Sequence, residues 1–461
     1  MIKLRPYQRE VIDKARHTMR RSIRRYMIVL PTGGGKTAIS THIIGETAAR
    51  GMTAFFLCHR VELLDQTEAT FQKAGIGYGL IAAGRPYEPD RTVYIGSIDT
   101  VRRRLDRIPR PDLLVIDEAA HTPANTWRQV VDTWPDAWRI GLTATPQRLS
   151  GEGFEDIFDE LVTGPSVADL IAQGWLAPYK MYAPPGVDPI GLRVRAGDYI
   201  PTEAAALVNR PTITGSAIEH YRRLSEGKRA VVFCAGVEHS KNVANDFNAA
   251  GYPAKHVDGT TPPDERRQAM EDFRAGRLLI LTNCNLFVEG VDVPALETCI
   301  LLRPTRSLSL YLQAVGRALR PGEGKTALIL DHVGACAMHG MPDEPHKWTL
   351  YGRARQSRAA NDNDPAPVIR VCDTCYAAFK PAACCPYCGA VSKPSAREIQ
   401  QREGELAEVQ RIETQKEARR EVGRARSLPE LIEIGRNRGY KNPAWWAQKI
   451  HNGRARKGVS M

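Results

Sequence analysis

The stretch that decides the fold is Val29-Leu30-Pro31-Thr32-Gly33-Gly34-Gly35-Lys36-Thr37. It overlaps an apolar run that favours a buried strand, Met27–Leu30, and precedes a segment that favours a helix, Ala38–Ile44. Strand, glycine turn and helix form the context that a phosphate-binding P-loop requires. Glycines let backbone N–H groups curl around a phosphate because no Cβ intervenes, and the helix N-terminus adds a partial positive charge.

The last two residues of this stretch supply a charge and a metal ligand. Lys36 is expected to reach the β- and γ-phosphates, and the Thr37 hydroxyl is expected to bind Mg²⁺. The loop has the shorter P-T-G-x-G-K-T form, because the first glycine of the longer pattern would fall at Leu30. A glycine turn that binds nothing is the alternative interpretation. The preferred prediction is an ATP site with Mg²⁺.

The composition is that of a globular protein with a basic surface. A length of 461 residues predicts roughly two to four domains. The net charge of +12 suits a polyanionic partner, most simply nucleic acid, and a solvated basic surface is the alternative. The first residues lack the apolar region of a secretory signal, and no apolar run approaches the ~18 residues of a membrane span. We therefore expect a cytoplasmic protein with no membrane partner.

Two series of apolar runs alternate with segments of helical character. The first series continues with 53–58, 93–95, 113–116 and 139–142, and the second consists of 229–234, 278–281, 298–302 and 327–330. Strands that alternate with helices imply parallel sheets covered on both faces. The second series has no P-loop of its own. The predicted fold class is α/β, with two tandem parallel-sheet domains.

Composition also divides the chain into segments. Prolines between 177 and 212 predict a connector, and a polar stretch at 356–367 predicts a linker. The predicted divisions are 1–176, an ATP-binding domain; 177–214, a connector; 215–345, a second domain; 346–367, a linker; 368–392, a cysteine module; and 393–461, a basic helical tail.

Two acids directly follow one of the apolar runs. Asp117 and Glu118 come after the predicted strand Leu113–Ile116. Carboxylates at the C-terminal end of such a strand lie near the P-loop in this architecture. Asp117 is expected to hold Mg²⁺ through water, and Glu118 is expected to orient and deprotonate the attacking water. An acidic turn without a catalytic role is the alternative.

The motifs, in order, resemble those of superfamily 2 helicases of the DEAD/DEAH type. They are Gln8, the P-T-G-x-G-K-T loop, D-E-A-A-H at Asp117–His121, T-A-T at Thr143–Thr145, the pair Thr282-Asn283 with Glu289–Asp292, and Q-A-V-G-R-A-L-R at Gln313–Arg320. The resemblance covers about residues 1–345. Within the superfamily, Leu4–Gln8, Arg303–Thr305 and the cysteine module look most similar to RadD-like and phage-type DNA helicases.

The resemblance implies two RecA-like domains and an ATP-dependent DNA helicase or translocase that hydrolyses ATP in the cleft between them. The nucleotide-binding residues that it implies are Arg5, Gln8, Thr32, Gly33, Gly34, Gly35, Lys36, Thr37, Gly290 and Asp292. The implied catalytic residues are Lys36, Asp117 and Glu118, with Arg317 and Arg320 as arginine fingers. A finger of this kind contributes about 10³–10⁵ to the rate. Since neither domain holds both the loop and the arginines, hydrolysis requires the cleft to close.

The resemblance also implies contacts with the sugar-phosphate backbone of single-stranded or forked DNA. The implied contact residues are His59, Arg60, Ser97, Thr100 and Thr282. Such contacts carry no sequence information. Arg102–Arg104 is either a further contact or a solvated helix end, and Thr143 and Thr145 would link the nucleotide state to DNA. The acidic box departs from the family pattern, because Ala120 takes its fourth position and His121 follows one place later. Either His121 takes over the coupling role or it is an ordinary polar residue.

Five of the ten cysteines cluster between Cys372 and Cys388. Four of them form two C-x-x-C pairs, Cys372 with Cys375 and Cys385 with Cys388, which nine residues separate. Thiolates at this spacing can surround one Zn²⁺ tetrahedrally. The segment is too short for its own core, so the metal would have to fold it. We predict a structural zinc module that helps to grip DNA or a partner protein; a redox pair or idle thiols are the alternative.

The last segment is basic and aromatic. No acid occurs between Ile434 and Met461, and Trp445 and Trp446 lie among its basic residues. Such a composition suits single-stranded nucleic acid, by charge and by stacking. Packing of the tryptophans against Leu428 and Leu431 is the competing interpretation, and we favour it for at least one of the two.

Three rival functions fit parts of the same pattern. An RNA helicase is one, since the motifs mainly contact the backbone. An ATP-gated nucleic-acid clamp without unwinding is another, with the cysteine module and the tail as its partner-binding parts. The third is the motor subunit of a restriction system, with the nuclease on a partner, because no nuclease motif is evident here. Under the leading hypothesis the expected partners are DNA and proteins of replication, repair or recombination.

Overall fold

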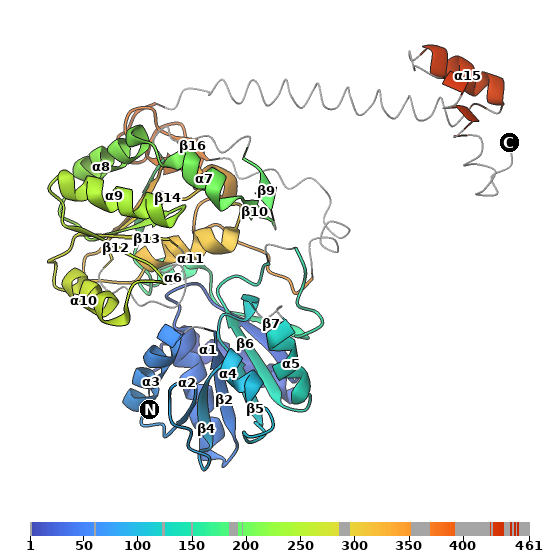
Figure 1. Cartoon of the computed structure of the whole chain (residues 1–461), viewed down its shortest axis with the longest axis vertical. Coiled ribbons are helices and arrows are strands. Elements are labelled where there is room, and N and C mark those ends of the chain that lie inside the picture. The colour runs from blue at the N-terminus through green and yellow to red at the C-terminus, as the bar shows by residue number, and fades with distance from the viewer. Residues whose placement is uncertain are drawn as a thin grey trace. The chain divides into compact units, whose positions relative to one another are not determined.

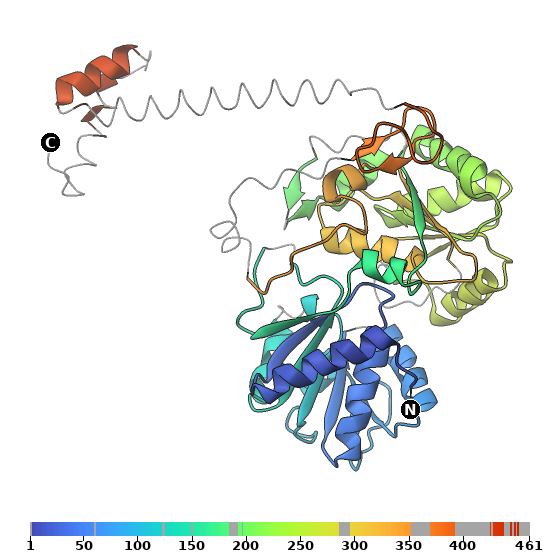
Figure 2. The same cartoon turned by 180° about the vertical axis from the view of Figure 1, so that it is seen from behind.

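The computed structural model describes residues 2–59, 61–121, 125–148, 151–183, 192–195, 197–284, 296–351 and 369–391, together with 425, 427–437, 443–444, 447–448 and 450. The chain divides into two compact units, Met1–Ala390 and Val391–Met461. The first unit contains two parallel-sheet lobes and a small cysteine module (Figures 1 and 2). Among the described residues, no helix is long and apolar enough to cross a membrane.

The first lobe is built on a seven-stranded sheet in the order β3-β4-β2-β5-β6-β1-β7, in which every neighbouring pair is parallel. Its strands are β1 (Arg25–Val29), β2 (Ala54–Cys58), β3 (Gly79–Ile81), β4 (Val93–Ser97), β5 (Leu113–Ile116), β6 (Trp138–Thr143) and β7 (Glu160–Thr163). Its helices are α1 (Pro6–Arg20), α2 (Lys36–Ala49), α3 (Val61–Ala74), α4 (Ile98–Arg103), η1 (Ala119–His121), α5 (Asn125–Thr133) and α6 (Val167–Ala172).

The central strands of this sheet are apolar along their whole length because helices cover both faces. Along β1, Tyr26 and Ile28 belong to one buried cluster, whereas Met27 and Val29 belong to the other. The first cluster includes Val11 of α1, and Figure 2 shows α1 lying across that face of the sheet.

The second lobe has a six-stranded parallel sheet in the order β12-β13-β11-β14-β15-β8. Its strands are β8 (Tyr179–Tyr182), β11 (Ala230–Cys234), β12 (Ala254–Val257), β13 (Ile280–Asn283), β14 (Thr298–Leu302) and β15 (Ala327–Asp331). Its helices are α7 (Pro201–Val208), α8 (Pro211–Ser225), α9 (Val237–Ala249), α10 (Pro263–Arg274), α11 (Leu308–Ala318) and α12 (Ala335–His339), and a small hairpin joins β9 (Val194–Arg195) to β10 (Asp198–Tyr199).

The fold class predicted from sequence is confirmed: the chain carries two α/β domains with parallel sheets. The runs 113–116 and 298–302 became β5 and β14 with the predicted bounds. β8 lies inside the stretch 177–214 that we expected to form a connector, and it is the edge strand of the second sheet.

The cysteine module packs on that edge strand. Its two strands, β16 (Arg370–Val371) and β17 (Ala378–Phe379), pair antiparallel. Ala377 forms a β-bridge with Tyr182 of β8. The module thereby continues the edge of the second sheet by one short pairing, which shields an otherwise open strand.

The second unit is described only in part. Its helix α15 (Leu428–Asn437) buries Leu431, and Ala447 belongs to the same small cluster. Trp445 and Trp446, for which stacking and packing were the two interpretations, lie outside the described residues.

Candidate nucleotide site between the two lobes

The predicted P-loop connects β1 to α2. Gly33 and Gly35 have φ angles of 83° and 82°, which L side chains rarely adopt. A Cβ on Gly35 would lie 2.1 Å from Nε2 of Gln8, so the side chain of Gln8 would have to move in addition to the strain of the positive φ. Gly35 caps the N-terminus of α2. The first N–H groups of a helix have no intrahelical partner, so this turn can bind a phosphate.

Lys36 and the two predicted acids meet at the mouth of the loop. Nζ of Lys36 lies 3.9 Å from Oε1 of Glu118, and the two side chains are only 12% and 11% exposed. Asp117 is also buried. Burial and the neighbouring Glu118 charge raise the pKa of Asp117, and the Lys36 ammonium opposes this rise. The buried cluster holds two carboxylates and only one ammonium group. A further cation would stabilise the ionised carboxylates, which fits the Mg²⁺ predicted from sequence.

Glu118 is held in a strained backbone conformation. Its φ is 46°, a left-handed value that is uncommon for a residue with a side chain. Its Oε2 is buried and has no hydrogen-bond partner in the described part of the chain. Strain and an unsatisfied carboxylate oxygen cluster at functional positions, where a ligand or water completes the site.

The N-terminal segment closes one side of the loop. Oε1 of Gln8 accepts a hydrogen bond from the Arg5 backbone N–H (2.9 Å), and Nε2 of Gln8 donates to the Gly34 carbonyl (3.4 Å). The Tyr7 hydroxyl donates to the same carbonyl at 2.8 Å. The Arg5 guanidinium lies 4.8 Å from the Trp175 ring centroid.

Sequence reasoning missed Tyr7 and Trp175. Tyr7 is adjacent to Gln8 in the motif Leu4–Gln8, so its position beside the loop could have been predicted from that motif. Trp175 lies 170 residues from its partner Arg5 in the sequence and carried no local signal.

The second lobe brings its arginine motif against the P-loop. A Cβ on Gly33 would lie 3.7 Å from Cγ of Arg320, and a Cβ on Gly316 would lie 2.6 Å from Cβ of Thr32. Burial lowers the pKa of Arg320, and the Arg317 side chain is buried as well. The predicted arginines and the predicted phosphate loop thus come from opposite lobes, and Arg320 lies against the loop.

A hydrogen bond also joins the lobes beside this contact. Oγ1 of Thr145 lies 2.5 Å from Oγ of Ser309, at the start of α11. Thr143 helps to hold Thr145 in position, because the Thr143 Oγ1 accepts a hydrogen bond from the Thr145 backbone N–H at 3.2 Å. The T-A-T motif is therefore in contact with the helix that carries the arginines.

The residues predicted to contact nucleic acid have mixed surroundings. Ser97 ends β4, and its Oγ lies 3.4 Å from Oγ1 of Thr100. Thr282 is fully buried and donates to the Ser240 carbonyl at 2.8 Å, so its hydroxyl is engaged inside the lobe. His59 follows β2. Arg60, Gly290 and Asp292 lie outside the described residues, and of His121 only its place in η1 is described.

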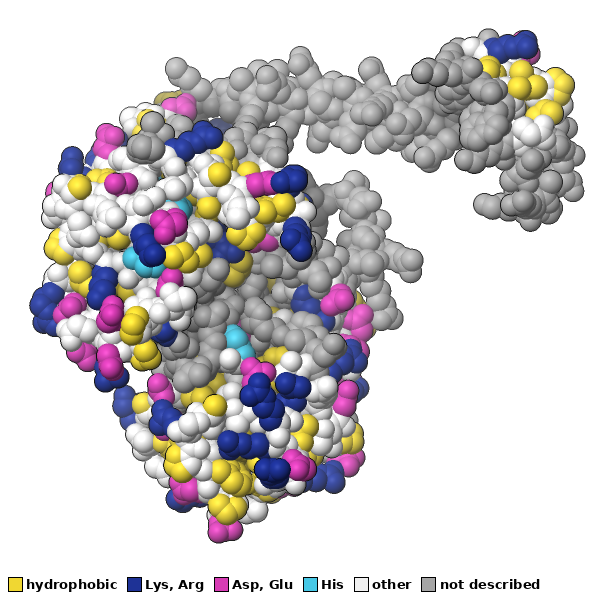
Figure 3. All heavy atoms as spheres, viewed as in Figure 1, with side chains coloured by type: hydrophobic (Ala, Val, Ile, Leu, Met, Phe, Trp, Pro, Cys, Tyr) yellow, Lys and Arg dark blue, Asp and Glu magenta, His cyan; other side chains and the backbone are white. Residues whose placement is uncertain are grey.

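Basic side chains gather on one face of the first lobe, around α4 and α5 (Figure 3). Arg102 and Arg103 end α4 and Arg104 follows it; Arg103 is exposed, and Arg102 and Arg104 are half-buried. Ser97 starts that helix as its N-cap. A positive face next to predicted backbone contacts suits a polyanion.

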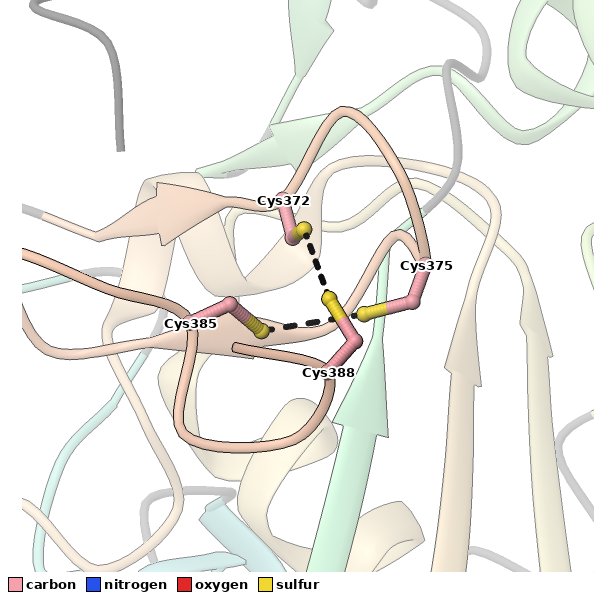
Figure 4. A group of neighbouring side chains, drawn as sticks. All are labelled: Cys372, Cys375, Cys385 and Cys388. Carbon is pink, nitrogen blue, oxygen red and sulfur yellow. Dashed lines mark hydrogen bonds between the residues drawn. The ribbon is translucent and has the colours of Figure 1, made fainter. Parts of the chain in front are cut away.

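The structure brings the four predicted zinc ligands together. The sulfur atoms of Cys372, Cys375, Cys385 and Cys388 all lie within 4.8 Å of one another. Two pairs face each other across the two turns, at 3.6 Å for Cys372 and Cys388 and at 3.7 Å for Cys375 and Cys385 (Figure 4). Zinc–sulfur bonds of about 2.3 Å in a tetrahedron give sulfur separations of about 3.8 Å, so the four residues fit a zinc ion.

Family comparisons agree with this architecture. Residues 1–148 match the model of the type III restriction enzyme res subunit, and residues 215–322 match the helicase conserved C-terminal domain. A 51.5 kDa protein of Lactococcus phage (isolate 7-9) is 37% identical over 325 residues, which are 70% of this chain and 69% of that protein. The DNA 3'-5' translocase XPB2 of Sulfurisphaera tokodaii is 25% identical over 72% of this chain and 82% of its own length.

Among solved structures, a fragment of a protein assigned as an HsdR subunit of a type I restriction enzyme from Vibrio vulnificus YJ016 shares the fold. Its TM-score is 0.58 at 22% identity, over 73% of this chain and 67% of that one. Fold and site define a nucleoside-triphosphate-binding protein with two RecA-like lobes. The family matches and the relatives narrow this class: the chain belongs to the superfamily 2 helicases of the DEAD/DEAH type, which hydrolyse ATP.

Proposed function

We propose that this protein is an ATP-dependent DNA helicase or translocase that hydrolyses ATP between its two lobes. One observation carries the proposal: Lys36 and Glu118 meet at the glycine loop of the first lobe, and Arg320 of the second lobe lies against Gly33 of the same loop. Hydrolysis that needs groups from both lobes ties the chemistry to the closing of the cleft. Alternate closing and opening then shifts two nucleic-acid-binding surfaces relative to each other.

The residues at the loop divide the chemical work. Lys36 and the α2 N-terminus bind the phosphates, and Thr37 and Asp117 hold the Mg²⁺ that offsets their charge. Glu118 orients the attacking water and accepts its proton. Arg317 and Arg320 offset the charge that develops on the γ-phosphate. Gln8, Arg5, Gly290 and Asp292 are proposed to bind the nucleoside.

DNA is the proposed polymer. The support is the net charge of +12, the basic face around α4, and the relative whose name states that it translocates on DNA. His59, Arg60, Ser97 and Thr100 remain proposed backbone contacts. Thr282 is buried and its hydroxyl is bonded to Ser240, so we propose that it supports the end of β13 rather than touching a phosphate.

The test is steady-state ATP hydrolysis with no polymer, single-stranded DNA, duplex DNA and single-stranded RNA. We expect stimulation by DNA and none by RNA. Glu118→Gln should abolish hydrolysis under every condition while nucleotide binding persists. Stimulation by RNA alone would overturn the choice of DNA, and normal hydrolysis by Glu118→Gln would overturn the assignment of the site.

We also propose that the cysteine module holds one structural Zn²⁺. The ion would cross-link the two turns, and the all-sulfur ligand set leaves no open position for catalysis. Metal analysis of the purified chain should give one zinc per chain. Cys385→Ser should lose it, whereas Cys384→Ser should retain it, because Cys384 is exposed and its sulfur lies outside the four-cysteine group. Equal zinc content in the two variants would contradict the proposed ligands.

A restriction motor is the second candidate function. It is favoured by the match of residues 1–148 to a restriction-enzyme subunit. Such a motor requires nuclease and modification partners on other chains. DNA-stimulated hydrolysis with no strand separation, together with co-purification of those partners, would favour it over a helicase.

A further inference from the structure

A cavity of about 380 Å³ opens on the first lobe, away from the nucleotide site. It lies between the C-terminal halves of α1 and α2, where β1 begins, on the face that Figure 2 presents. Thr47 lines it and lies eleven residues after Lys36 on α2, which is about 16 Å along the helix axis. None of the residues assigned to nucleotide or nucleic acid lines this cavity.

Below its rim, the cavity is lined mainly by apolar side chains. Ile12, Ala15 and Tyr26 are buried in it, and Met19 and Ile43 complete its walls. The Tyr26 side chain is fully buried, yet its hydroxyl has no hydrogen-bond partner in the described part of the molecule. Burial raises the pKa of Tyr26, so the phenol stays a neutral donor. A buried donor of this kind is rare without a water or ligand as its acceptor.

The rim of the cavity is positively charged. Arg16, Arg20, Arg50 and Glu46 line it, which makes three guanidinium groups and one carboxylate. Arg16 is committed to Glu46 at 2.6 Å and to Asp13 at 2.9 Å. His42 also approaches Glu46, at 3.3 Å. Glu46 is thus already compensated by the Arg16 guanidinium.

The other two rim arginines remain available. Arg20 and Arg50 are exposed, and neither forms an ion pair with any described residue. An apolar floor suits a hydrocarbon group, the buried phenol needs an acceptor oxygen, and free guanidinium groups favour a carboxylate. The three features together fit an amphipathic anion, for which the apolar floor favours a hydrocarbon group.

We propose that this cavity binds a carboxylate attached to an apolar group, with the apolar group on the floor, an acceptor oxygen at Tyr26 and the carboxylate at Arg20 and Arg50. Two sources offer this chemistry: a free organic acid, and the C-terminal residue of a peptide with an apolar side chain. The site does not depend on the polymer on which the enzyme acts.

Isothermal titration calorimetry of the full chain with N-acetylphenylalanine tests the proposal. We expect a Kd on the order of 1 mM, which is ordinary for a ligand of this size. N-acetylphenylalaninamide has the same ring and no carboxylate, and it should bind at least about tenfold more weakly. Equal binding of the acid and the amide, or no heat from the acid at 10 mM (roughly ten times the expected Kd), would overturn the proposal.

Variants locate the binding. Arg50→Ala should weaken binding of the acid about tenfold, whereas Arg9→Ala, on the exposed side of α1, should leave it unchanged. Tyr26→Phe should weaken binding and leave thermal stability unchanged or higher, since it removes an unsatisfied buried hydroxyl. Unweakened binding by both Arg50→Ala and Tyr26→Phe would place the ligand elsewhere and contradict the site.

The peptide Asp-Asp-Phe with a free C-terminus separates the two sources. Binding at least about tenfold tighter than that of N-acetylphenylalanine would identify a peptide terminus as the ligand, because its extra carboxylates meet the same positive rim. Equal binding would identify a free organic acid. Weaker binding of the peptide than of the amide would contradict a site for carboxylates.

Discussion

The two lobes are built alike and equipped differently. In each, a strand inside a parallel sheet is followed by a turn and a helix: β1 by the P-loop and α2, β11 by a turn and α9. The first turn carries three glycines, Lys36 and Thr37, whereas the second, Ala235-Gly236, leads into α9 without a lysine. The sheets therefore provide position, and the loops at their carboxyl ends decide which lobe binds phosphate.

What the second lobe contributes comes from a different element. The C-terminal end of α11 carries Gly316 and Arg317, and Arg320 follows it; Gly316 and Arg320 lie against the P-loop. The site is therefore asymmetric: one lobe binds the nucleotide, and the other completes the chemistry.

Arg320→Ala should have the largest effect. We expect kcat for ATP hydrolysis to fall about 10³–10⁵-fold, with nucleotide binding largely kept, because the P-loop lies on the other lobe. Rapid-quench kinetics and nucleotide titration measure the two quantities. Arg306→Ala, an exposed arginine just before α11, is the matched control. A loss of nucleotide binding as large as the loss of kcat would erase the distinction between the lobes.

Lys36→Ala tests the other side of the division. We expect kcat to fall about 10²–10³-fold, on the scale of a lost electrostatic donor, and nucleotide binding to weaken as well. Calorimetric titration with a slowly hydrolysed ATP analogue measures the binding. Lys73→Ala, an exposed lysine on α3, should behave as the unmodified protein. Binding that survives intact in Lys36→Ala would mean that the loop is not the phosphate site.

Gly316→Ala targets the contact between the lobes without touching a charge. Its new Cβ would lie 2.6 Å from Cβ of Thr32, so the lobes must separate slightly or the turn must shift. A displacement of this size should lower kcat about 10–100-fold. The control is Gly215→Ala on α8, where a Cβ meets no heavy atom within 4 Å. Full activity of Gly316→Ala would show that this contact is absent during turnover.

Within both lobes, elements differ in how far the sequence predicted them. Local patterns predicted β5 and β14 with their bounds, the P-loop, and the cysteine pairs, because each feature is contiguous and has few physical solutions. β3 has only three residues, and β8, with the sequence Tyr-Lys-Met-Tyr, lacks the apolar run that marked β5. β8 was also hidden in a proline-rich stretch.

Contacts between distant segments could not be predicted from composition or spacing. Trp175 near Arg5, the unsatisfied Tyr26 hydroxyl, and Ser309 opposite Thr145 all depend on how helices pack, and nothing adjacent in the chain marks them. The family resemblance named Thr145 but not its partner. The order of motifs therefore indicates which residues act, and only the packed structure indicates what they touch.

The smallest predicted effect concerns that last contact. The Thr145–Ser309 hydrogen bond joins the lobes at 2.5 Å and involves no charge. Thr145→Val keeps the shape of a side chain that is only 1% exposed and removes its hydroxyl. A neutral hydrogen bond contributes about 1 kcal/mol, so kcat/KM for ATP should fall about fivefold if the bond forms as the cleft closes.

Ser309→Ala should have a similar effect, and the double variant should be no worse than either single one, because both substitutions remove the same bond. Additive losses would mean that the two hydroxyls act independently, for instance on the nucleic acid. Thr143→Val offers a further comparison, since its hydroxyl supports Thr145 from within the first lobe. If its loss is coupled to that of Ser309→Ala, the T-A-T motif transmits closure through one hydrogen-bonded path. If the losses add, Thr143 only stabilises the turn at Thr143–Thr145 within the first lobe. The link between the lobes then depends on Thr145 alone.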